Sequence, residues 1–326
     1  MSEKLSFREN GLRASESRKR RQREPWGNRK AKILVPIDGS EEAKAAMPVA
    51  RATARITGAT IHVLHVAEHH LSREELLQHL GLPRDEIHGI VLEQATGLPS
   101  AAILGWAEAN KAMLILLSAK SREPLTRPQE RQVLDPVIQK APCPVLVTRP
   151  EASRRITETS ELRHILLPLD GAPSSAAVTG PALDLAERTG AELDILHVAG
   201  PGPQPNEMGA MTVPRYVDQP QYEWPTWVHE FEGRFGTPVG KIQPHAPTRV
   251  FLRRGEPAEE ILHFAAERGS DLIVLEWRGR LALRFAKVVR GVLGAAPCPV
   301  LLLRTSQPKG REEEAPARRH APLGTG

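Results

Sequence analysis

Short apolar runs alternate with longer amphipathic stretches along much of the chain. The run at 33–37 (ILVPI) is followed by Asp38 and Gly39, as expected of a buried parallel strand that ends in a turn. Ser40 then suits the N-cap of a helix that Gly58 ends. The apolar face of this helix is formed by Ala43, Ala46, Met47, Ala50 and Ala54. The pattern therefore predicts a strand and a helix as the first elements.

The same succession of strands and helices occurs twice. Residues 32–40, 59–68, 97–117 and 141–149 recur as 164–172, 191–200, 255–275 and 296–304. The second copy gains 26 residues between its second and third strands and loses three between its fourth and fifth. A repeat of this size predicts two copies of one structural unit.

Each copy is expected to hold five strands. After the first strand come second strands at 61–66 and 193–198, third strands near 87–93 and 248–254, helices at about 98–110 and 257–268, fourth strands at 113–117 and 272–276, and, after a third helix, closing strands at 144–148 and 299–303. Alternating strands and helices predict an α/β fold with a parallel sheet in each unit and helices on both faces.

The closing strands follow the sequence APCPV in both copies, and the prolines fit a strand start or an edge. An exposed apolar edge strand needs a cover. We therefore expect the two closing strands to meet across a pseudo-twofold axis, so that the two units form a pseudo-dimer.

These patterns divide the chain into five parts. We expect a disordered basic arm at 1–30, a first domain at 31–150, a linker at 151–161, a second domain at 162–306 with an insertion near 200–227, and a disordered tail at 307–326. Proline and glycine in the insertion argue against a regular element, and from its end onward aromatic residues recur at helical spacing, at Trp224, Trp227, Phe231 and Phe235. This segment is either a flap with an aromatic core stripe, or else a partner surface or a lid over the site near Asp170.

The positive charge of the chain lies in its terminal segments. The formal net charge is +5, but residues 1–30 carry +6 and residues 307–326 carry +1, which leaves −2 for residues 31–306. The arm is therefore a solubilising tail or an anchor for nucleic acid or an acidic partner, and the folded part is not expected to bind nucleic acid. No apolar run is long enough to span a membrane, so we expect a cytoplasmic protein without a membrane partner.

Asp38 and Asp170 follow the first strand of each copy, where ligands bind in open parallel sheets. An aspartate there can accept from a ribose hydroxyl or an adenine amino group, or hold Mg²⁺. It can equally satisfy backbone N–H groups of its own turn. The sequence leaves these two roles open.

The segments VPIDGS, LHV, DLIVLE and APCPVLLLR resemble the universal stress protein family, and matches cover both copies. The resemblance implies two tandem Rossmann-like, adenine nucleotide alpha hydrolase-like domains and a role in the stress response. Many members bind ATP, and others act through dimerisation or partners. It identifies candidate cofactor-binding residues in both halves: Asp38, Val66, Asp170, Val198, Gly279, Arg280 and Lys287.

ATP-binding members of the family carry a glycine-rich loop after the fourth strand, with Ser or Thr at its end. Glycine lets backbone N–H groups approach phosphates at a helix N-terminus. In the first half these places hold Ser118, Ser121, Arg131 and Gln132. In the second half they hold Glu276 and Gly279, with Ala286 and Lys287 where Gly and Ser would stand. The phosphate loop is thus incomplete in both halves.

Arginines gather around both loops and offer another way to hold an anion. Arg278, Arg280, Arg284, Lys287 and Arg290 surround the second loop, and Arg122, Arg127 and Arg131 the first. They form either a solvated helix face or a site for a phosphate or an acidic partner.

The histidines and cysteines do not form a recognisable metal site or redox pair. His62 and His65 are expected to point to opposite faces of their strand. The spacing of the histidines does not predict zinc, and Cys143 and Cys298 are expected to pack as small apolar groups.

The sequence also contains no nucleophile–base motif, so we do not expect an enzyme. The resulting prediction is a noncatalytic stress-response regulator or interaction protein with degenerate ATP-binding loops, which acts through a protein partner or self-association. The alternatives are an ATP-binding protein with slow hydrolysis and a nucleic-acid binder that uses the basic arm.

Overall fold

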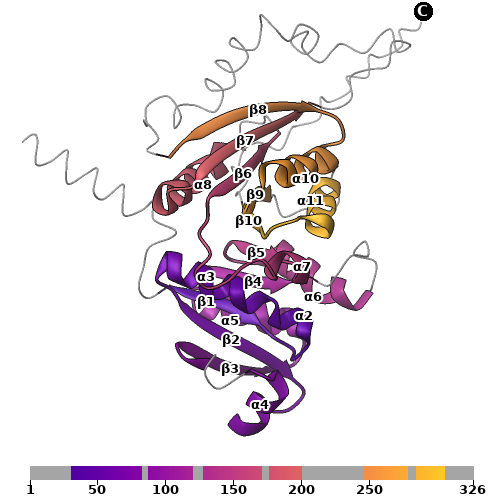
Figure 1. Ribbon diagram of the computed structural model, residues 1–326. Coiled ribbons are helices and arrows are strands. Elements are labelled where there is room, and N and C mark those ends of the chain that lie inside the picture. Colours follow the sequence, from indigo (N-terminus) through magenta and orange to yellow (C-terminus); the bar gives the residue numbers. More distant parts are fainter. Residues whose placement is uncertain are drawn as a thin grey trace, which may run out of the picture.

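The structure is a computed structural model that describes residues 31–82, 87–119, 128–170, 176–199, 246–277 and 284–304. These residues form one ten-stranded sheet in the order β3-β2-β1-β4-β5-β10-β9-β6-β7-β8 (Figure 1). The strands are β1 (Lys32–Pro36), β2 (Thr60–Ala67), β3 (Ile90–Thr96), β4 (Leu114–Ser118), β5 (Val145–Thr148), β6 (His164–Leu169), β7 (Glu192–Ala199), β8 (Thr248–Arg254), β9 (Leu272–Trp277) and β10 (Val300–Arg304). Each half repeats one parallel order of five strands, as the sequence repeat predicts.

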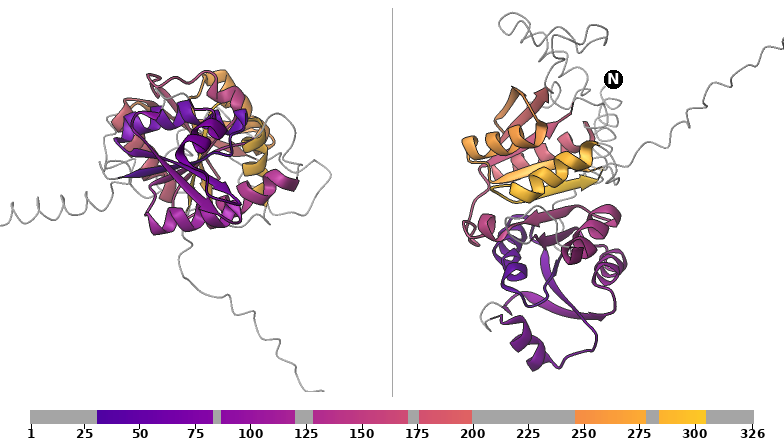
Figure 2. Two further views of the ribbon diagram at one scale, coloured as in Figure 1. Left: turned by 90° about the horizontal axis from the view of Figure 1, so that it is seen from below. Right: turned by 90° about the vertical axis from the view of Figure 1, so that its right-hand side faces the viewer.

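Helices cover both faces of this sheet, and the two halves lie end to end along it (Figures 1 and 2). The helices are α2 (Glu41–Lys44), α3 (Ala46–Thr57), α4 (Arg73–Leu80), α5 (Pro99–Ala109), α6 (Pro128–Lys140), α7 (Pro150–Ser153), α8 (Ala176–Thr189), α10 (Pro257–Arg268) and α11 (Arg284–Ala295). Within the described part of the chain, none of these helices is both long and apolar enough to cross a membrane.

The strands alternate their side chains between two hydrophobic cores, one on each face of the sheet. Ile33 and Val35 enter the core beneath α3 and α8, whereas Leu34 enters the core beneath α5, α6, α10 and α11. Because strand residues point alternately to opposite faces, continuous apolar runs fill both cores at once. The predicted α/β class with helices on both faces is confirmed.

The two halves join where β5 and β10 pair in antiparallel fashion. Val147 lies opposite Val300, Leu146 opposite Leu301 and Val145 opposite Leu302. All six side chains are buried. The expectation that the two closing strands meet across a pseudo-twofold axis is therefore confirmed, and neither strand is left as an exposed edge.

On one face of the sheet, helices and side chains seal this junction. The Trp277 indole N–H in the second half donates to the Ile138 carbonyl of α6 at 2.8 Å. Arg304 donates to the Ala141 carbonyl at 3.2 Å, and Arg290 of α11 lies 3.6 Å from the Asp135 carboxylate of α6. Both α6 and α11 thus contribute to the joint between the halves.

Two local elements differ from the sequence-based expectation. The predicted single helix between Ser40 and Gly58 is divided into α2 and α3, because Pro48 has no N–H to donate to the Lys44 carbonyl. The helix α4 was not predicted at all, although Ser72 and Glu75 form a capping box in which each side chain accepts from the other residue's backbone N–H. The predicted helix end at Gly58 is confirmed, since Gly58 has φ of +70°, and Gly190 has the same φ directly after α8.

We expect the β5–β10 junction to be essential for the stability of both halves. Val300→Asp buries an unpaired carboxylate where 1% of the side chain is exposed, and should cost about 3–5 kcal/mol of folding free energy. Val91→Asp makes the same change on the outer strand β3, where Val91 is 39% exposed, and should cost far less. Chemical denaturation of both variants measures the difference, and equal tolerance of the two changes would contradict the role of the junction.

Candidate functional site

Parallel pairing brings the candidate residues of each half to one edge of the sheet. Pro36 pairs with Leu64 and Leu169 with His197, so the register carries Asp38 toward Val66 and Asp170 toward Val198. Val66 and Val198 are half-buried, whereas Asp38 and Asp170 are exposed. Because β5 and β10 run antiparallel, the carboxyl ends of the strands in the two halves lie at opposite edges of the sheet. The two candidate sites are therefore separate.

The Asp38 carboxylate takes part in its own turn. Its Oδ1 accepts from the Ser40 backbone N at 3.0 Å and from the Ser40 hydroxyl at 2.6 Å. The Ser40 hydroxyl in turn accepts from the Ala43 N–H and caps α2. The hydrogen bonds of Oδ1 therefore fit the turn role that the sequence leaves open, in which the aspartate satisfies backbone N–H groups of its own turn.

Helix α4 lies against the turn that carries Asp38. His79 Nε2 donates to the Asp38 carbonyl at 3.2 Å, and the His79 and His65 rings are 4.8 Å apart. Gly39 has φ of +90°, and a Cβ there would meet the His79 carbonyl oxygen at 2.8 Å. The unpredicted helix thus borders the first candidate site and requires glycine at this position.

The histidine of the LHV segment has the same role in both halves. His65 Nδ1 donates to the Ile37 carbonyl at 3.0 Å, and His197 Nδ1 donates to the Leu169 carbonyl at 2.9 Å. Each histidine therefore fixes the residue before the candidate aspartate. His62 lies on the opposite face of β2, as expected, where its Nδ1 is 3.1 Å from Glu93 and its ring is 5.0 Å from that of Trp106.

In the second half, the residues that begin the expected phosphate loop are buried. Glu276 and Trp277 are each 2% exposed, and Trp277 is hydrogen-bonded across the junction to α6. In the first half, the equivalent strand ends at Ser118, which is half-buried and pairs with Thr148. The end of β9 is thus part of the joint between the halves.

The remaining candidate residues do not come together in the described part of the chain. The Lys287 side chain is 82% exposed, and its Nζ is 3.7 Å from the Glu256 carboxylate. Arg290 pairs with Asp135. Ser121, Gly279 and Arg280 lie outside the described residues, as do residues 1–30, residues 307–326 and the insertion with the aromatic residues expected to form a helix.

Cys143 and Cys298 are free thiols that pack against the core beneath α5, α6, α10 and α11. Burial raises the pKa of each thiol to about 12, so both are neutral at physiological pH. Among the described residues, no group of three or more His, Cys, Asp or Glu side chains is arranged to hold a metal ion.

Sequence reasoning missed two residues that shape these edges, His79 and Trp277. The capping box before α4 was a readable signal for the helix that carries His79. For Trp277 there was no comparable signal, because its partner Ile138 is 139 residues away in the sequence.

The comparisons with known proteins agree with the repeat and with the fold. A model of the universal stress protein family matches residues 31–149 and again residues 161–304. A universal stress protein of Bacillus subtilis (strain 168) is 31% identical over 152 residues, which are 43% of this chain and 97% of that protein. One from Mycobacterium tuberculosis (strain ATCC 25618 / H37Rv) is 25% identical over 204 residues, which are 61% of this chain and 64% of the relative.

Solved structures share the arrangement of both halves. A universal stress protein from Archaeoglobus fulgidus DSM 4304 superposes with a TM-score of 0.59 at 18% identity, over 84% of this chain and 98% of that one. A functionally unknown protein from Pseudomonas aeruginosa PAO1 gives a TM-score of 0.57 at 18% identity, over 85% and 93% of the two chains. At this identity the likeness concerns the fold alone.

The contact between Gly39 and His79 can be tested with a pair of glycine substitutions. Gly97 has φ of +102° and open space around it, so Gly97→Ala should cost only the backbone strain of about 1–2 kcal/mol. Gly39→Ala adds a clash with the His79 carbonyl and should cost about 1–3 kcal/mol more. Denaturant unfolding gives both values, and equal losses would show that α4 does not press on this turn.

The buried thiols should make stability fall in alkaline solution. The pKa of the Cys298 thiol is about 12 in the folded protein, whereas an unperturbed thiol has a pKa of 9.0. The unfolded chain therefore releases this proton first as pH rises. The contribution of this thiol to the free energy of unfolding is fully present below pH 9.0. Between pH 9.0 and pH 12 it is lost by about 1.4 kcal/mol per pH unit. Unfolding midpoints between these pH values should fall more steeply for the native chain than for Cys298→Ala, and parallel curves would contradict the assignment.

Proposed function

The chain belongs to the universal stress protein family, and we propose that it is a noncatalytic regulator or interaction protein of the stress response. Residues 31–150 and 162–306 are its two domains, joined by the linker at 151–161, and together they form a covalent pseudo-dimer. Its proposed partner is another protein or a second copy of itself, and its proposed location is the cytoplasm.

One observation carries this proposal: the end of β9 is part of the joint between the halves. In ATP-binding relatives, the loop after the fourth strand supplies glycine N–H groups to phosphates. Here the loop begins with buried Glu276, followed by Trp277, whose indole is hydrogen-bonded to α6. A buried carboxylate at this point opposes the approach of a triphosphate. We infer that the second half has given up phosphate binding.

Two further features favour a regulator over a nucleotide enzyme. In the first half, the Asp38 oxygen Oδ1 already accepts two hydrogen bonds from Ser40, and α4 lies against the same turn. Among the candidate cations of the second half, Lys287 points into solvent and pairs with Glu256. Exposed ion pairs of this kind contribute little to stability, and a lysine that already faces a carboxylate is a poor anion site.

The second candidate function is adenine-nucleotide binding, with residual or slow hydrolysis. The register that brings Asp38 beside Val66, and Asp170 beside Val198, favours it. Gly279, Arg280 and Lys287 would then supply the phosphate contacts. ATP remains the candidate cofactor of this alternative.

Calorimetric titration of the purified full-length protein with Mg·ATP separates the two functions. We expect no micromolar binding, and no change when Asp38→Asn or Asp170→Asn is titrated in the same way. Micromolar binding that either variant abolishes would establish the nucleotide-binding alternative instead. Mass spectrometry of small molecules released from the purified protein provides an independent check, because a copurified adenine nucleotide would also overturn the proposal.

A further inference from the structure

The two faces of the β5–β10 junction are covered differently. On one face α6 and α11 meet above the central strands, where Arg290 pairs with Asp135. On the other face, α3 packs in the first half and α8 in the second, on either side of the central strand pair (Figure 1). A groove of about 890 Å³ lies on this face, between the halves.

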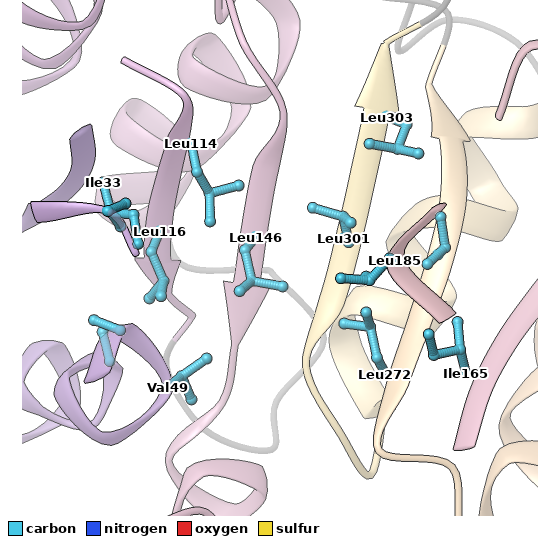
Figure 3. Packing of buried hydrophobic residues seen from close by; sticks show 14 of the residues in the cluster. Ile33, Val49, Leu114, Leu116, Leu146, Ile165, Leu185, Leu272, Leu301 and Leu303 are labelled. Atoms are coloured by element: carbon cyan, nitrogen blue, oxygen red, sulfur yellow. The ribbon is translucent and has the colours of Figure 1, made fainter. Parts of the chain in front are cut away.

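The groove has an apolar floor and walls. Leu146 and Leu301 come from the two central strands, flanked by Leu114 and Leu272 (Figure 3). Val49 of α3 and Leu185 of α8 belong to the walls. A cavity with this lining and volume is within the usual range of about 300–1,000 Å³ for small-molecule sites.

The linker between the halves lines part of the groove and is held against α3. Arg55 of α3 donates to the Glu158 carbonyl at 3.1 Å and to the Ser160 carbonyl at 2.8 Å. Residues of this segment, among them Ile156 and Leu162, line the groove. An apolar floor with polar residues at its rim suits a molecule with an apolar chain and a polar head.

The polar rim of the groove carries two arginines and two carboxylates, and one of the arginines has no ion partner among the described residues. The Glu161 carboxylate pairs with Arg163 at 3.3 Å, and Asp271 accepts from the backbone N–H groups of Arg163 and His164 at 2.8 and 2.9 Å. Arg155 also lines the groove, and within the described part of the chain its guanidinium makes no ion pair or hydrogen bond. A guanidinium binds carboxylates and phosphates by paired hydrogen bonds.

A buried hydroxyl lies beside the same groove. Ser270 is 8% exposed, lines the groove, and its Oγ has no hydrogen-bond partner among the described residues. Leaving such a group unpaired is costly, and a hydroxyl can rotate to meet a new acceptor. It offers a ligand oxygen a second polar contact.

We propose that this groove is a binding site for a single-chain amphipathic carboxylate, whose apolar chain lies on Leu146 and Leu301 and whose head group pairs with Arg155. The site lies at the junction of the halves, and it goes beyond the proposed regulatory function by giving the pseudo-dimer a ligand of its own. Because both halves line it, an occupant stabilises the joint between them.

The test uses the full-length protein and two probes with the same chain and opposite charges, dodecanoate and dodecylammonium, both below their micelle-forming concentrations. We expect saturable calorimetric binding of dodecanoate, with a rise in the unfolding temperature, and no such effect of dodecylammonium. No saturable binding of dodecanoate, or equal binding of the two probes, overturns the proposal.

Variants locate the bound molecule. Arg155→Gln should weaken dodecanoate binding about tenfold or more, because a charge-assisted hydrogen bond is lost. Arg154→Gln makes the same change at an exposed neighbour that does not line the groove, and should bind as the native chain does. Ala52→Leu, which narrows the groove from α3, should reduce binding as well.

Equal affinity of the two arginine variants overturns the proposal, even where Ala52→Leu fails to fold. These titrations contain no nucleotide, so their outcome is independent of whether the protein binds ATP.

Discussion

The pairing of β5 with β10 is the interaction on which the rest of the structure depends. A parallel half-sheet of this order ends in a short, apolar closing strand, and an open apolar edge invites association with other chains. Each closing strand finds its partner in the other half, through Val145, Leu146 and Val147 on one side. The outer strand β8 is protected by other means, since it carries Arg249, Arg253 and Arg254. The duplication therefore supplies a permanent partner for both apolar closing strands.

The joint is not symmetrical across the sheet, although the two halves repeat one topology. On one face α6 and α11 approach each other over the central strands through Arg290 and Asp135, and Trp277 at the end of β9 bonds to α6. On the other face α3 and α8 lie on either side of the strand pair, and the linker crosses between them, held by Arg55. The groove thus results from the way in which one chain connects two parallel units at the antiparallel β5–β10 junction.

Much of this fold could be predicted from the sequence because its signals are local or repeated. Apolar runs followed by Asp and Gly identified the first strands, and the repeat doubled the evidence for each element. The division between α2 and α3 was readable from Pro48, and α4 from its capping box. The groove and the bond from Trp277 to Ile138 were not predictable in this way, because they depend on packing between residues more than a hundred positions apart.

The candidate sites follow the same division between local and distant causes. Asp38 and its turn are local, and the sequence placed this aspartate after the first strand, where the structure finds it bonded to Ser40. Whether a phosphate can bind near such an aspartate depends on the end of the fourth strand in the same half. In the second half this strand is β9, and it ends with the buried residues Glu276 and Trp277. Trp277 directly follows Glu276, the first position of the expected loop, and the Trp277 side chain is held in the joint by its bond to Ile138. The proposed absence of phosphate binding in the second half and the strength of the joint are therefore linked, because the strand end that would lead into a phosphate loop is fixed to α6 of the first half.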